Sequence, residues 1–272
     1  MRYIPVLTIA GSDCSGGAGI QADIKTISAL GCYAASAITA VTVQNTVGVT
    51  AVEAVRPSVV AGQIHAVMDD IQPEAIKIGM VNDAATIKAI ADALRPYSPK
   101  NVVVDPVMVS TSGHSLMQND ALAVFRSELM SLATLLTPNV KEAEVLSGLS
   151  ITDEASCNAA GLVIARDSHC QVLIKGGHFS GSTKADRLYD ATGRLSEEYV
   201  CETVDTNNTH GTGCTLSSAI ASYMARGCSV TDAIRLAKAY ITEALKGGAG
   251  VSIGHGHGPV NHFFNPMKME II

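Results

Sequence analysis

The sequence predicts an α/β protein with three layers, in which helices cover both faces of one mostly parallel sheet. Runs rich in β-branched residues alternate with amphipathic runs along most of the chain. Parallel strands need crossover connections, which are usually helices. The 272 residues are 47% hydrophobic, which is enough to bury a large core. Because no linker, repeat or low-complexity tract interrupts the pattern, we expect a single domain over residues 1–272.

In the first half of the chain, sequence signals mark where the predicted helices and strands begin and end. Ile20, Ile24 and Ile27 lie on one face of a predicted helix that Gly31 ends, and Pro57 precedes another helix. The elements expected in order are strand 3–10, helix 20–30, strand 34–43, helix 58–69, strand 75–78, helix 83–94 and strand 102–105.

The second half continues the alternation and then changes character. Residues 186–204 resemble an antiparallel hairpin at a sheet edge, with its turn near Gly193. A glycine-rich tail begins at Gly247. The other elements expected are helix 120–129, strand 134–137, helices 140–146 and 153–166, strand 172–175, and helices at roughly 213–226 and 229–246.

Composition favours a small-molecule ligand. The net charge of -6 and pI of about 5.7 argue against nucleic acid or an anionic membrane surface as partners. No apolar run reaches the roughly 18 residues of a membrane span, and the amino terminus lacks the order of a secretory signal, so we expect a cytoplasmic protein. The seven cysteines include no CxxC pair, which predicts reduced thiols rather than disulfides or a zinc site.

Two glycine-rich segments are candidates for ligand binding. The first, GSDCSGGAG, continues into a GxGxxA pattern, but its glycines come late after the strand and no acidic residue ends the next strand, which disfavours a dinucleotide site. No P-loop motif occurs. The second segment, NTHGTGC, precedes a predicted helix. The amides of Gly211, Thr212, Gly213 and Cys214 would point outward at its positive end and suit a phosphoryl oxygen, although a simple tight turn explains the glycines equally well.

Cys214 stands at the start of that helix. A helix N-terminus lowers the pKa of a thiol, so the sequence predicts a useful thiolate fraction and a role as general base. The alternative is a buried thiol on the core face of the helix.

Five polar residues near element ends have both a functional and a structural interpretation. Asp105 closes the strand NVVVDP, where parallel sheets bind ligands, or it forms an Asp-Pro turn. Asn139 and Glu142 match a capping box, which competes with metal binding. Asp23 could simply complement the positive end of its helix. Gln44 ends a buried strand, and its amide offers the donor and acceptor that read an aminopyrimidine edge, unless it is a satisfied loop amide.

Eight segments together resemble one family, the hydroxymethylpyrimidine and hydroxymethylpyrimidine-phosphate kinases of thiamine biosynthesis, within the ribokinase-like superfamily. They run in order from residue 10 to residue 260. The matching segments are AGSDCSGGAGIQADIKT, ITAVTVQNT, IKIGM, VVVDPVMVSTSG, LTPNVKEAEVL, VLIKGGH, NTHGTGCTLSSAIA and GHGHGPV.

The resemblance implies a ribokinase-like fold that transfers a phosphoryl group from ATP, with Mg²⁺, first to the alcohol and then to its monophosphate. It assigns the pyrimidine to four residues, which are Gly11, Asp23, Gln44 and Met80. It assigns Mg²⁺ to Asp105 and Glu142, and the nucleotide and its phosphates to Asn139, Lys175, Thr209 and Lys238. It makes residues 211–214 the anion hole, with Cys214 as the base.

The resemblance also bears on architecture and on substrate. The superfamily's sugar kinases insert a β-sheet lid after the first strand, but here helix 20–30 leads directly into strand 34–43, so no lid is expected and a homodimer is implied. Loops near residues 110–114 and the glycine-rich tail would shield the substrate instead. The nearest alternative is a pyridoxal kinase. Some relatives that favour pyridoxal carry cysteine at the position of Ser110, so the serine favours the pyrimidine. A non-catalytic sensor on the same scaffold is a further alternative.

Overall fold

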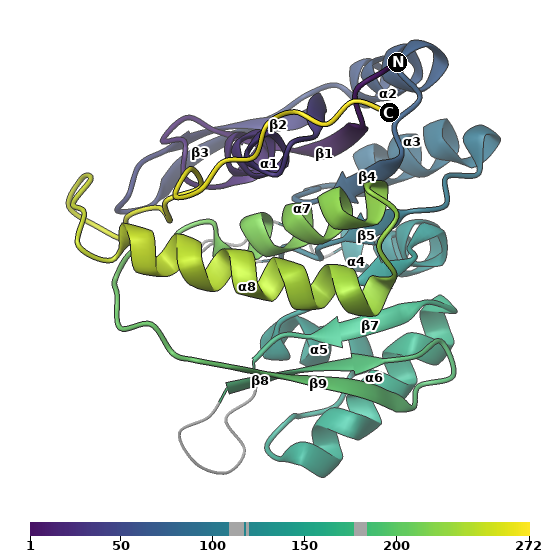
Figure 1. The fold of residues 1–272 in the computed structure, drawn as a ribbon. Coiled ribbons are helices and arrows are strands. Elements are labelled where there is room, and N and C mark those ends of the chain that lie inside the picture. The colour runs from purple at the N-terminus through teal and green to yellow at the C-terminus, as the bar shows by residue number, and fades with distance from the viewer. Residues whose placement is uncertain (109–116, 118–119, 177–183) are drawn as a thin grey trace.

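The computed structural model describes residues 1–108, 117, 120–176 and 184–272. Within these residues, nine strands form one sheet in the order β3-β2-β1-β4-β5-β6-β7-β8-β9 (Figure 1). The strands are β1 (Pro5–Asp13), β2 (Tyr33–Gln44), β3 (Val49–Ala54), β4 (Ala75–Ile78), β5 (Val102–Val104), β6 (Leu135–Leu136), β7 (Gln171–Ile174), β8 (Lys184–Tyr189) and β9 (Leu195–Cys201). The six central strands pair in parallel, and they are β2, β1, β4, β5, β6 and β7. Antiparallel strands lie at both edges, with β3 at one and β8 and β9 at the other.

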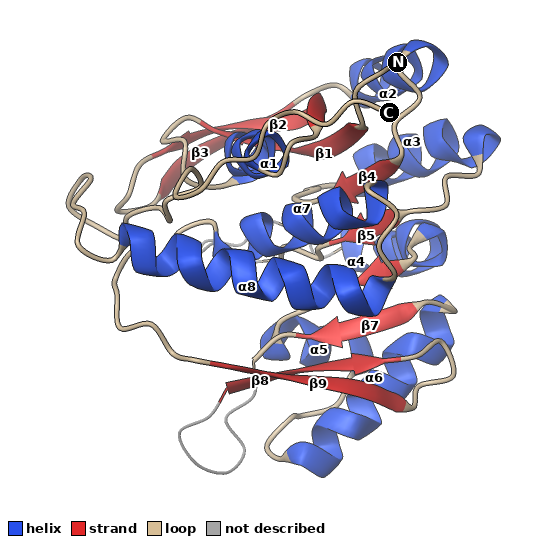
Figure 2. Ribbon diagram, viewed as in Figure 1, coloured by secondary structure: helices blue, strands red, loops and turns tan. Residues whose placement is uncertain are grey.

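Helices lie on both sides of this sheet (Figure 2). They are α1 (Gly19–Ala29), α2 (Pro57–Asp70), α3 (Ala84–Leu94), α4 (Ala121–Val124), α5 (Val140–Ser147), α6 (Glu154–Ser168), α7 (Thr212–Ala225) and α8 (Val230–Gly248). Buried residues of α1, α7 and α8 form one apolar cluster, and those of α2 to α6 form a second. The three-layer α/β/α architecture is therefore confirmed.

The central strands are buried on both faces because their successive side chains point to opposite sides. In β5, Val102 and Val104 belong to the cluster under α2 to α6, whereas Val103 belongs to the cluster under α1, α7 and α8. Leu173 of β7 likewise faces the cluster opposite to its two neighbours in the strand. Continuous apolar runs at these positions thus identify a sheet covered on both sides.

Most predicted elements lie where they were expected, including the hairpin β8–β9 at the edge. β3 was not predicted, because its half-exposed residues pair only with β2 and show no clear alternation. The expected helix 120–129 is irregular: α4 is four residues long and continues as a π-helical turn over Phe125–Leu129. Only Leu30–Cys32 separate α1 from β2, so this fully described stretch holds no β-sheet lid, as predicted.

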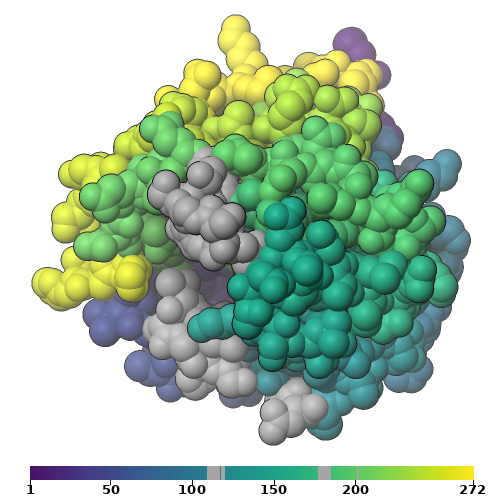
Figure 3. All heavy atoms as spheres, turned by 90° about the horizontal axis from the view of Figure 1, so that it is seen from below, coloured from purple at the N-terminus to yellow at the C-terminus, as the bar shows by residue number. Residues whose placement is uncertain are grey.

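The topology brings distant parts of the sequence together. In the space-filling view of Figure 3, teal segments from the middle of the chain lie against green segments from its last third. The carboxyl ends of the parallel strands share one edge of the sheet, where β1 ends at Asp13 and β2 ends at Gln44. Gly211, which precedes α7, meets the first glycine-rich loop there, since a Cβ on it would come within 1.8 Å of the Gly17 carbonyl oxygen. No helix of the described part is long and apolar enough to cross a membrane.

Candidate active site

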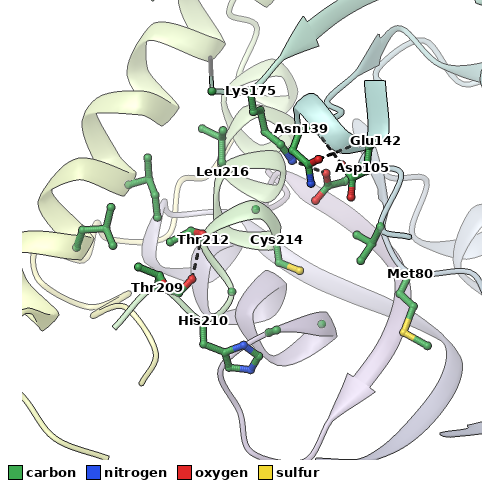
Figure 4. A pocket seen from close by; sticks show the side chains of 18 of the residues that line it. Met80, Asp105, Asn139, Glu142, Lys175, Thr209, His210, Thr212, Cys214 and Leu216 are labelled. Carbon is green, nitrogen blue, oxygen red and sulfur yellow. Dashed lines mark hydrogen bonds and ion pairs between the residues drawn. The ribbon is translucent and has the colours of Figure 1, made fainter. Parts of the chain in front are cut away.

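A cavity of about 940 Å³ opens at the carboxyl ends of the strands. Ligands bind at this edge in open α/β sheets. Thirteen of the fourteen predicted site residues line the cavity, namely Gly11, Gln44, Met80, Asp105, Asn139, Glu142, Lys175, Thr209, Lys238, Gly211, Thr212, Gly213 and Cys214. Figure 4 shows the sulfur of Cys214, in that view, between Asp105 above and His210 below.

The second glycine-rich segment opens α7 at the cavity wall. Gly211 is the N-cap residue, with a φ of 80° that favours glycine. Thr215 N donates to Gly211 O at 2.8 Å, which closes the first helical turn. A Cβ on Gly213 would lie 3.5 Å from Asp105 Oδ2 and 3.6 Å from Lys175 Nζ, so this residue directly adjoins the charged part of the cavity. The amides that begin α7 are thus available to an anion in the cavity.

Asp105 and Lys175 form the charged centre of the cavity (Figure 4). Lys175 Nζ donates to Asp105 Oδ1 at 2.8 Å. Thr137 Oγ1 donates to the same oxygen at 3.1 Å, and Ser217 Oγ to Oδ2 at 3.3 Å. Burial alone would raise the pKa of Asp105, but the charges of Lys175 and Lys77 outweigh it and lower that pKa. The Asp105 carboxylate is therefore ionised, and it is not only an Asp-Pro turn.

Glu142 combines the structural and the functional interpretation. Its amide donates to Asn139 Oδ1 at 2.9 Å, and Asn139 N donates back to Glu142 Oε2 at 2.8 Å, so the capping box is present. The same carboxyl group lines the cavity. Burial raises the pKa of Glu142 to about 7, while the charge of Lys175 lowers it and that of Asp105 raises it.

Asp105 and Glu142 fit a Mg²⁺ ion that also binds phosphate. The charge of Asp105 acts on the pKa of Glu142, so the two carboxylates are close, and a cation between them would relieve that repulsion. Within the described ranges, no group of three or more His, Cys, Asp or Glu side chains could hold a metal. Mg²⁺ typically takes one or two protein carboxylates and completes its shell with water and phosphate oxygens. The donor set agrees with that arrangement.

Lys238 of α8 approaches the cavity beside the antiparallel edge. Its ammonium group forms an ion pair with Asp186 of β8, whose other oxygen accepts from Gly176 N at 2.7 Å. Thr209 lies across the cavity wall, where its carbonyl accepts from Thr212 Oγ1 at 3.0 Å. Asp186 was not among the predicted residues, although it holds the lysine in place.

The opposite end of the cavity is less charged. Met80 lies over Gly11, where a Cβ would come within 3.2 Å of the Met80 sulfur. Gln44 extends its amide beside Thr42, and Thr42 Oγ1 lies 3.1 Å from Gln44 Oε1. An aromatic ring with polar edges suits such a wall, which combines a thioether with an amide.

Asp23 differs from the other predicted site residues, because its side chain does not line the cavity. Both of its oxygens accept from Lys77 Nζ at 2.9 Å, and both side chains are 0% exposed. Thr8 Oγ1 and Ser218 Oγ also donate to it, at 2.6 and 2.7 Å. Nor does it complement the start of α1, whose first turn contains no acidic residue. Asp23 neutralises a buried lysine, which the sequence pattern could not reveal.

The predicted lowering of the Cys214 pKa is wrong. Its side chain is half-buried in the cavity wall, away from the core position that would have excluded chemistry. Burial raises the pKa of its thiol to about 11, although the charge of Lys77 acts in the opposite direction. The lowering expected from the helix N-terminus does not prevail, since desolvation is the larger effect.

Sequence reasoning missed two further residues, Asp13 and His210. They stand in the two glycine-rich motifs, and both line the cavity with little exposure. His210 Nε2 lies 2.9 Å from Asp13 Oδ2 and 3.3 Å from Gln44 Nε2. The signal available was their position inside motifs already selected for their glycines.

Comparison with known proteins identifies the family. The family model described as phosphomethylpyrimidine kinase matches residues 13–261. The chain belongs to the phosphomethylpyrimidine kinase family. It is 49% identical over 258 residues to the hydroxymethylpyrimidine/phosphomethylpyrimidine kinase of Rhizobium meliloti (strain 1021), covering 94% of this chain and 96% of that one. A thiamine biosynthesis bifunctional protein of Geobacter sulfurreducens is 47% identical, and the match spans 94% of this chain and 52% of that longer protein.

Solved structures agree on the ribokinase-like fold. A phosphomethylpyrimidine kinase from Clostridium difficile 630 is similar with a TM-score of 0.78 and 46% identity, covering 89% of this chain and 99% of that one. The pyridoxal kinase from Staphylococcus aureus in complex with AMP-PCP and pyridoxal has a TM-score of 0.86 at 32% identity, covering 98% and 97%.

Proposed function

We propose that this protein is an ATP-dependent kinase that phosphorylates 4-amino-5-hydroxymethyl-2-methylpyrimidine and then phosphorylates the monophosphate, in thiamine biosynthesis. The observation that carries the proposal is the single cavity, which joins an anion-binding helix start and an acid–lysine pair to an amide and a thioether. The names of the most similar relatives describe the same activity. An ATP analogue bound by a structural neighbour supports ATP as the phosphoryl donor.

Phosphoryl transfer depends mainly on positioning and on charge stabilisation. The amides of residues 211–214 would bind the oxygens of the migrating group, and Lys175 would neutralise charge beside them. Asn139, Thr209 and Lys238 would hold the nucleotide and its phosphates. Asp105 and Glu142 would hold Mg²⁺, which neutralises phosphate charge when bound.

The two acceptors place different demands on Cys214. An alcohol must lose a proton, whereas a phosphomonoester is already largely anionic at pH 7, since its second pKa is about 6. The Cys214 thiol lies beside the start of α7 and would take the alcohol proton in the first step. Because its pKa is about 11, only a small thiolate fraction exists at neutral pH, and the first step should depend on pH.

Side-by-side turnover on two substrates tests the substrate class. Pyridoxal is the second candidate, because the structure of a pyridoxal kinase superposes on 98% of this chain with a TM-score of 0.86. Ser110, the residue expected to discriminate, lies outside the described residues, as does the predicted loop 110–114. We expect kcat/KM for the hydroxymethylpyrimidine to exceed that for pyridoxal by at least about tenfold, and the reverse order would favour the alternative.

The Gln44→Leu variant tests the pyrimidine wall. Removing the amide should raise the KM for the pyrimidine by about tenfold, the usual cost of a lost substrate hydrogen bond, and leave the KM for ATP intact. An unchanged pyrimidine KM would remove Gln44 from the site.

We further propose a homodimer. Val41 and Val43 on β2 and Val47 in the following turn are 47%, 59% and 65% exposed, and such a patch is typical of an interaction surface.

The proposal that residues 1–272 are one domain is supported by two core clusters that each contain residues from both halves of the chain. The described cysteines are free thiols, which supports a reducing cytoplasm.

A further inference from the structure

Asp13 and His210 form a closely fixed pair at the pyrimidine end of the cavity. Asp13 is 3% exposed and His210 is 7% exposed. The Asp13 carboxylate accepts from Ser15 N and from Ala18 N, both at 2.8 Å, so the first glycine-rich loop wraps around it. His210 Nε2 lies 2.9 Å from Asp13 Oδ2. An ionised carboxylate only accepts hydrogen bonds, so Nε2 of His210 carries a proton whether the ring is neutral or charged.

The ionised state of Asp13 is supported by its surroundings. Burial alone would raise the pKa of this carboxyl group, but hydrogen bonds from His210, Ser15 and Ala18 outweigh burial and lower it to about 2.

Packing holds the His210 ring in place as well. A Cβ on Gly17 would lie 2.3 Å from His210 Cδ2, so only glycine lets the loop approach the ring. The backbone amide of His210 donates to Gly258 O at 3.1 Å, which ties the residue to the glycine-rich tail. The imidazole therefore has one orientation in the wall of the cavity, and a rigid donor orients its neighbours more effectively than a mobile one.

The protonated Nε2 of His210 determines which atom of the Gln44 amide, Oε1 or Nε2, faces the histidine ring. The Gln44 nitrogen lies 3.3 Å from His210 Nε2, but an Nε2 that carries its hydrogen has no lone pair to accept from that nitrogen. Turning the amide by a half-turn about its last bond puts Oε1 toward His210 and Nε2 toward Thr42. Thr42 Oγ1 lies 3.0 Å from Ser12 O and gives its hydrogen to that carbonyl, so it is free to accept from the amide. The single hydrogen on His210 Nε2 is then shared between Asp13 Oδ2 and Gln44 Oε1, and the Gln44 nitrogen donates to Thr42 Oγ1.

We propose that Asp13 and His210 are positioning residues that fix the order in which Gln44 presents its amide oxygen and nitrogen to an aminopyrimidine. A 4-aminopyrimidine has an amino donor beside a ring-nitrogen acceptor, and an amide pairs with that edge in one order only. The reversed amide would set donor against donor and acceptor against acceptor. The pair thus selects for the amino group, and this inference rests on the proposed contact between Gln44 and the pyrimidine.

Two substitutions of His210 separate donation from packing. His210→Met keeps the bulk and removes the donor, and it should raise the KM for the aminopyrimidine by about tenfold while leaving the KM for ATP within about twofold. His210→Gln carries an amide nitrogen that can reach the position of Nε2, and it should restore the pyrimidine KM to within about threefold. Equal KM values for the two variants, or no change in His210→Met, would overturn the proposal.

A substrate analogue measures the selection directly. With 5-hydroxymethyl-2-methylpyrimidine, which lacks the amino group, wild type should show kcat/KM reduced by about tenfold, and His210→Met should lose most of that preference. An unchanged preference in His210→Met would contradict the proposal even if both KM values rose.

Nitrogen-15 NMR of the histidine rings needs neither substrate nor turnover. In the wild-type protein, the His210 ring should carry a hydrogen on Nε2, and Asp13→Asn should reduce that bias. Asp190→Asn is the matched control, because Asp190 accepts from Thr192 N at 2.9 Å in the β8–β9 turn and does not line the cavity. An unprotonated Nε2 in wild type would overturn this inference and leave the proposed function intact. An unchanged pyrimidine KM in Gln44→Leu would instead reject the proposed contact between Gln44 and the pyrimidine.

Discussion

Two aspartate–lysine pairs of almost equal length have different surroundings in this molecule. Asp23 and Lys77 meet at 2.9 Å with both side chains 0% exposed, whereas Asp105 and Lys175 meet at 2.8 Å at the cavity wall, where Lys175 is 16% exposed. Both aspartates were predicted to bind ligands. We propose that access to the cavity, rather than the motif or the pairing distance, separates a structural ion pair from one that can exchange its partner for a ligand.

Breaking the sealed pair should have the largest effect. Lys77→Met leaves the Asp23 carboxylate buried without its counter-charge, so it should lower the free energy of unfolding by about 3–5 kcal/mol in urea titrations. Lys88→Met is the matched control, because Lys88 is 62% exposed in its pair with Asp92 and should lose no more than about 1 kcal/mol. The double variant Asp23→Leu with Lys77→Met should recover most of the loss. A loss below about 1 kcal/mol in Lys77→Met would mean that the pair is not sealed.

Breaking the open pair should affect turnover more than stability. Asp105→Asn preserves the shape and one accepting oxygen, which can keep the hydrogen bond from Thr137, yet it removes a charge beside the migrating phosphoryl group. We expect kcat to fall by about 10²- to 10³-fold, with at most about 2 kcal/mol lost from the free energy of unfolding. Steady-state ATP consumption and urea titration give the two values. A kcat within about threefold of wild type would place Asp105 with Asp23 as a structural residue.

Charges from both pairs act on the pKa of the Cys214 thiol. A Cys214 variant should change the rates of the two transfers by different factors. Cys214→Ala should slow phosphorylation of the alcohol by about 10²-fold and phosphorylation of the monophosphate by no more than about threefold. Because the pKa of the thiol is raised to about 11, its thiolate population grows tenfold per pH unit below that value. The first rate should therefore rise from about pH 6 to pH 9 in wild type and stay flat in the variant. Equal losses in both steps would indicate a structural or anion-binding role.

A third acid–base pair, Asp13 with His210, gives the smallest effect and an intermediate case. The pKa of Asp13 is about 2 in the folded protein, below the ordinary value of 3.8 for aspartate, so its interactions stabilise the protein above about pH 4 and are lost as the pH falls toward 2. Asp13→Asn should therefore cost about 2 kcal/mol at pH 7 and almost nothing near pH 2. A difference that does not depend on pH would show that the carboxylate charge is not what stabilises this loop.

Most of the fold was predictable because it rests on local patterns. The continuous apolar run of β5, the Pro57 start of α2 and the Asn139 capping box are all visible in short stretches of sequence. β3 was not predictable, since an edge strand with one neighbour buries too little surface to show a pattern. The π-helical turn after α4 also has no sequence signal of its own.

The site was predictable at the level of segments and less so at the level of side chains. The motifs located the cavity wall, but Asp23 of α1 pairs with Lys77 of β4, which is 54 residues away. The pair of Asp13 and His210 spans 197 residues. The pKa of Cys214 depended on how much water the folded cavity excludes. Charge pairing and desolvation are consequences of tertiary structure, so single-sequence reasoning could name the residues without deciding their roles.

Phosphorus NMR of the protein with ATP, Mg²⁺ and 4-amino-5-hydroxymethyl-2-methylpyrimidine tests the central claim most directly. The account predicts that resonances of a pyrimidine monophosphate appear first and those of a pyrimidine diphosphate follow, while ATP is converted to ADP in proportion. A spectrum in which ATP stays intact in the presence of this alcohol, or in which ATP is hydrolysed to free phosphate alone, would contradict it.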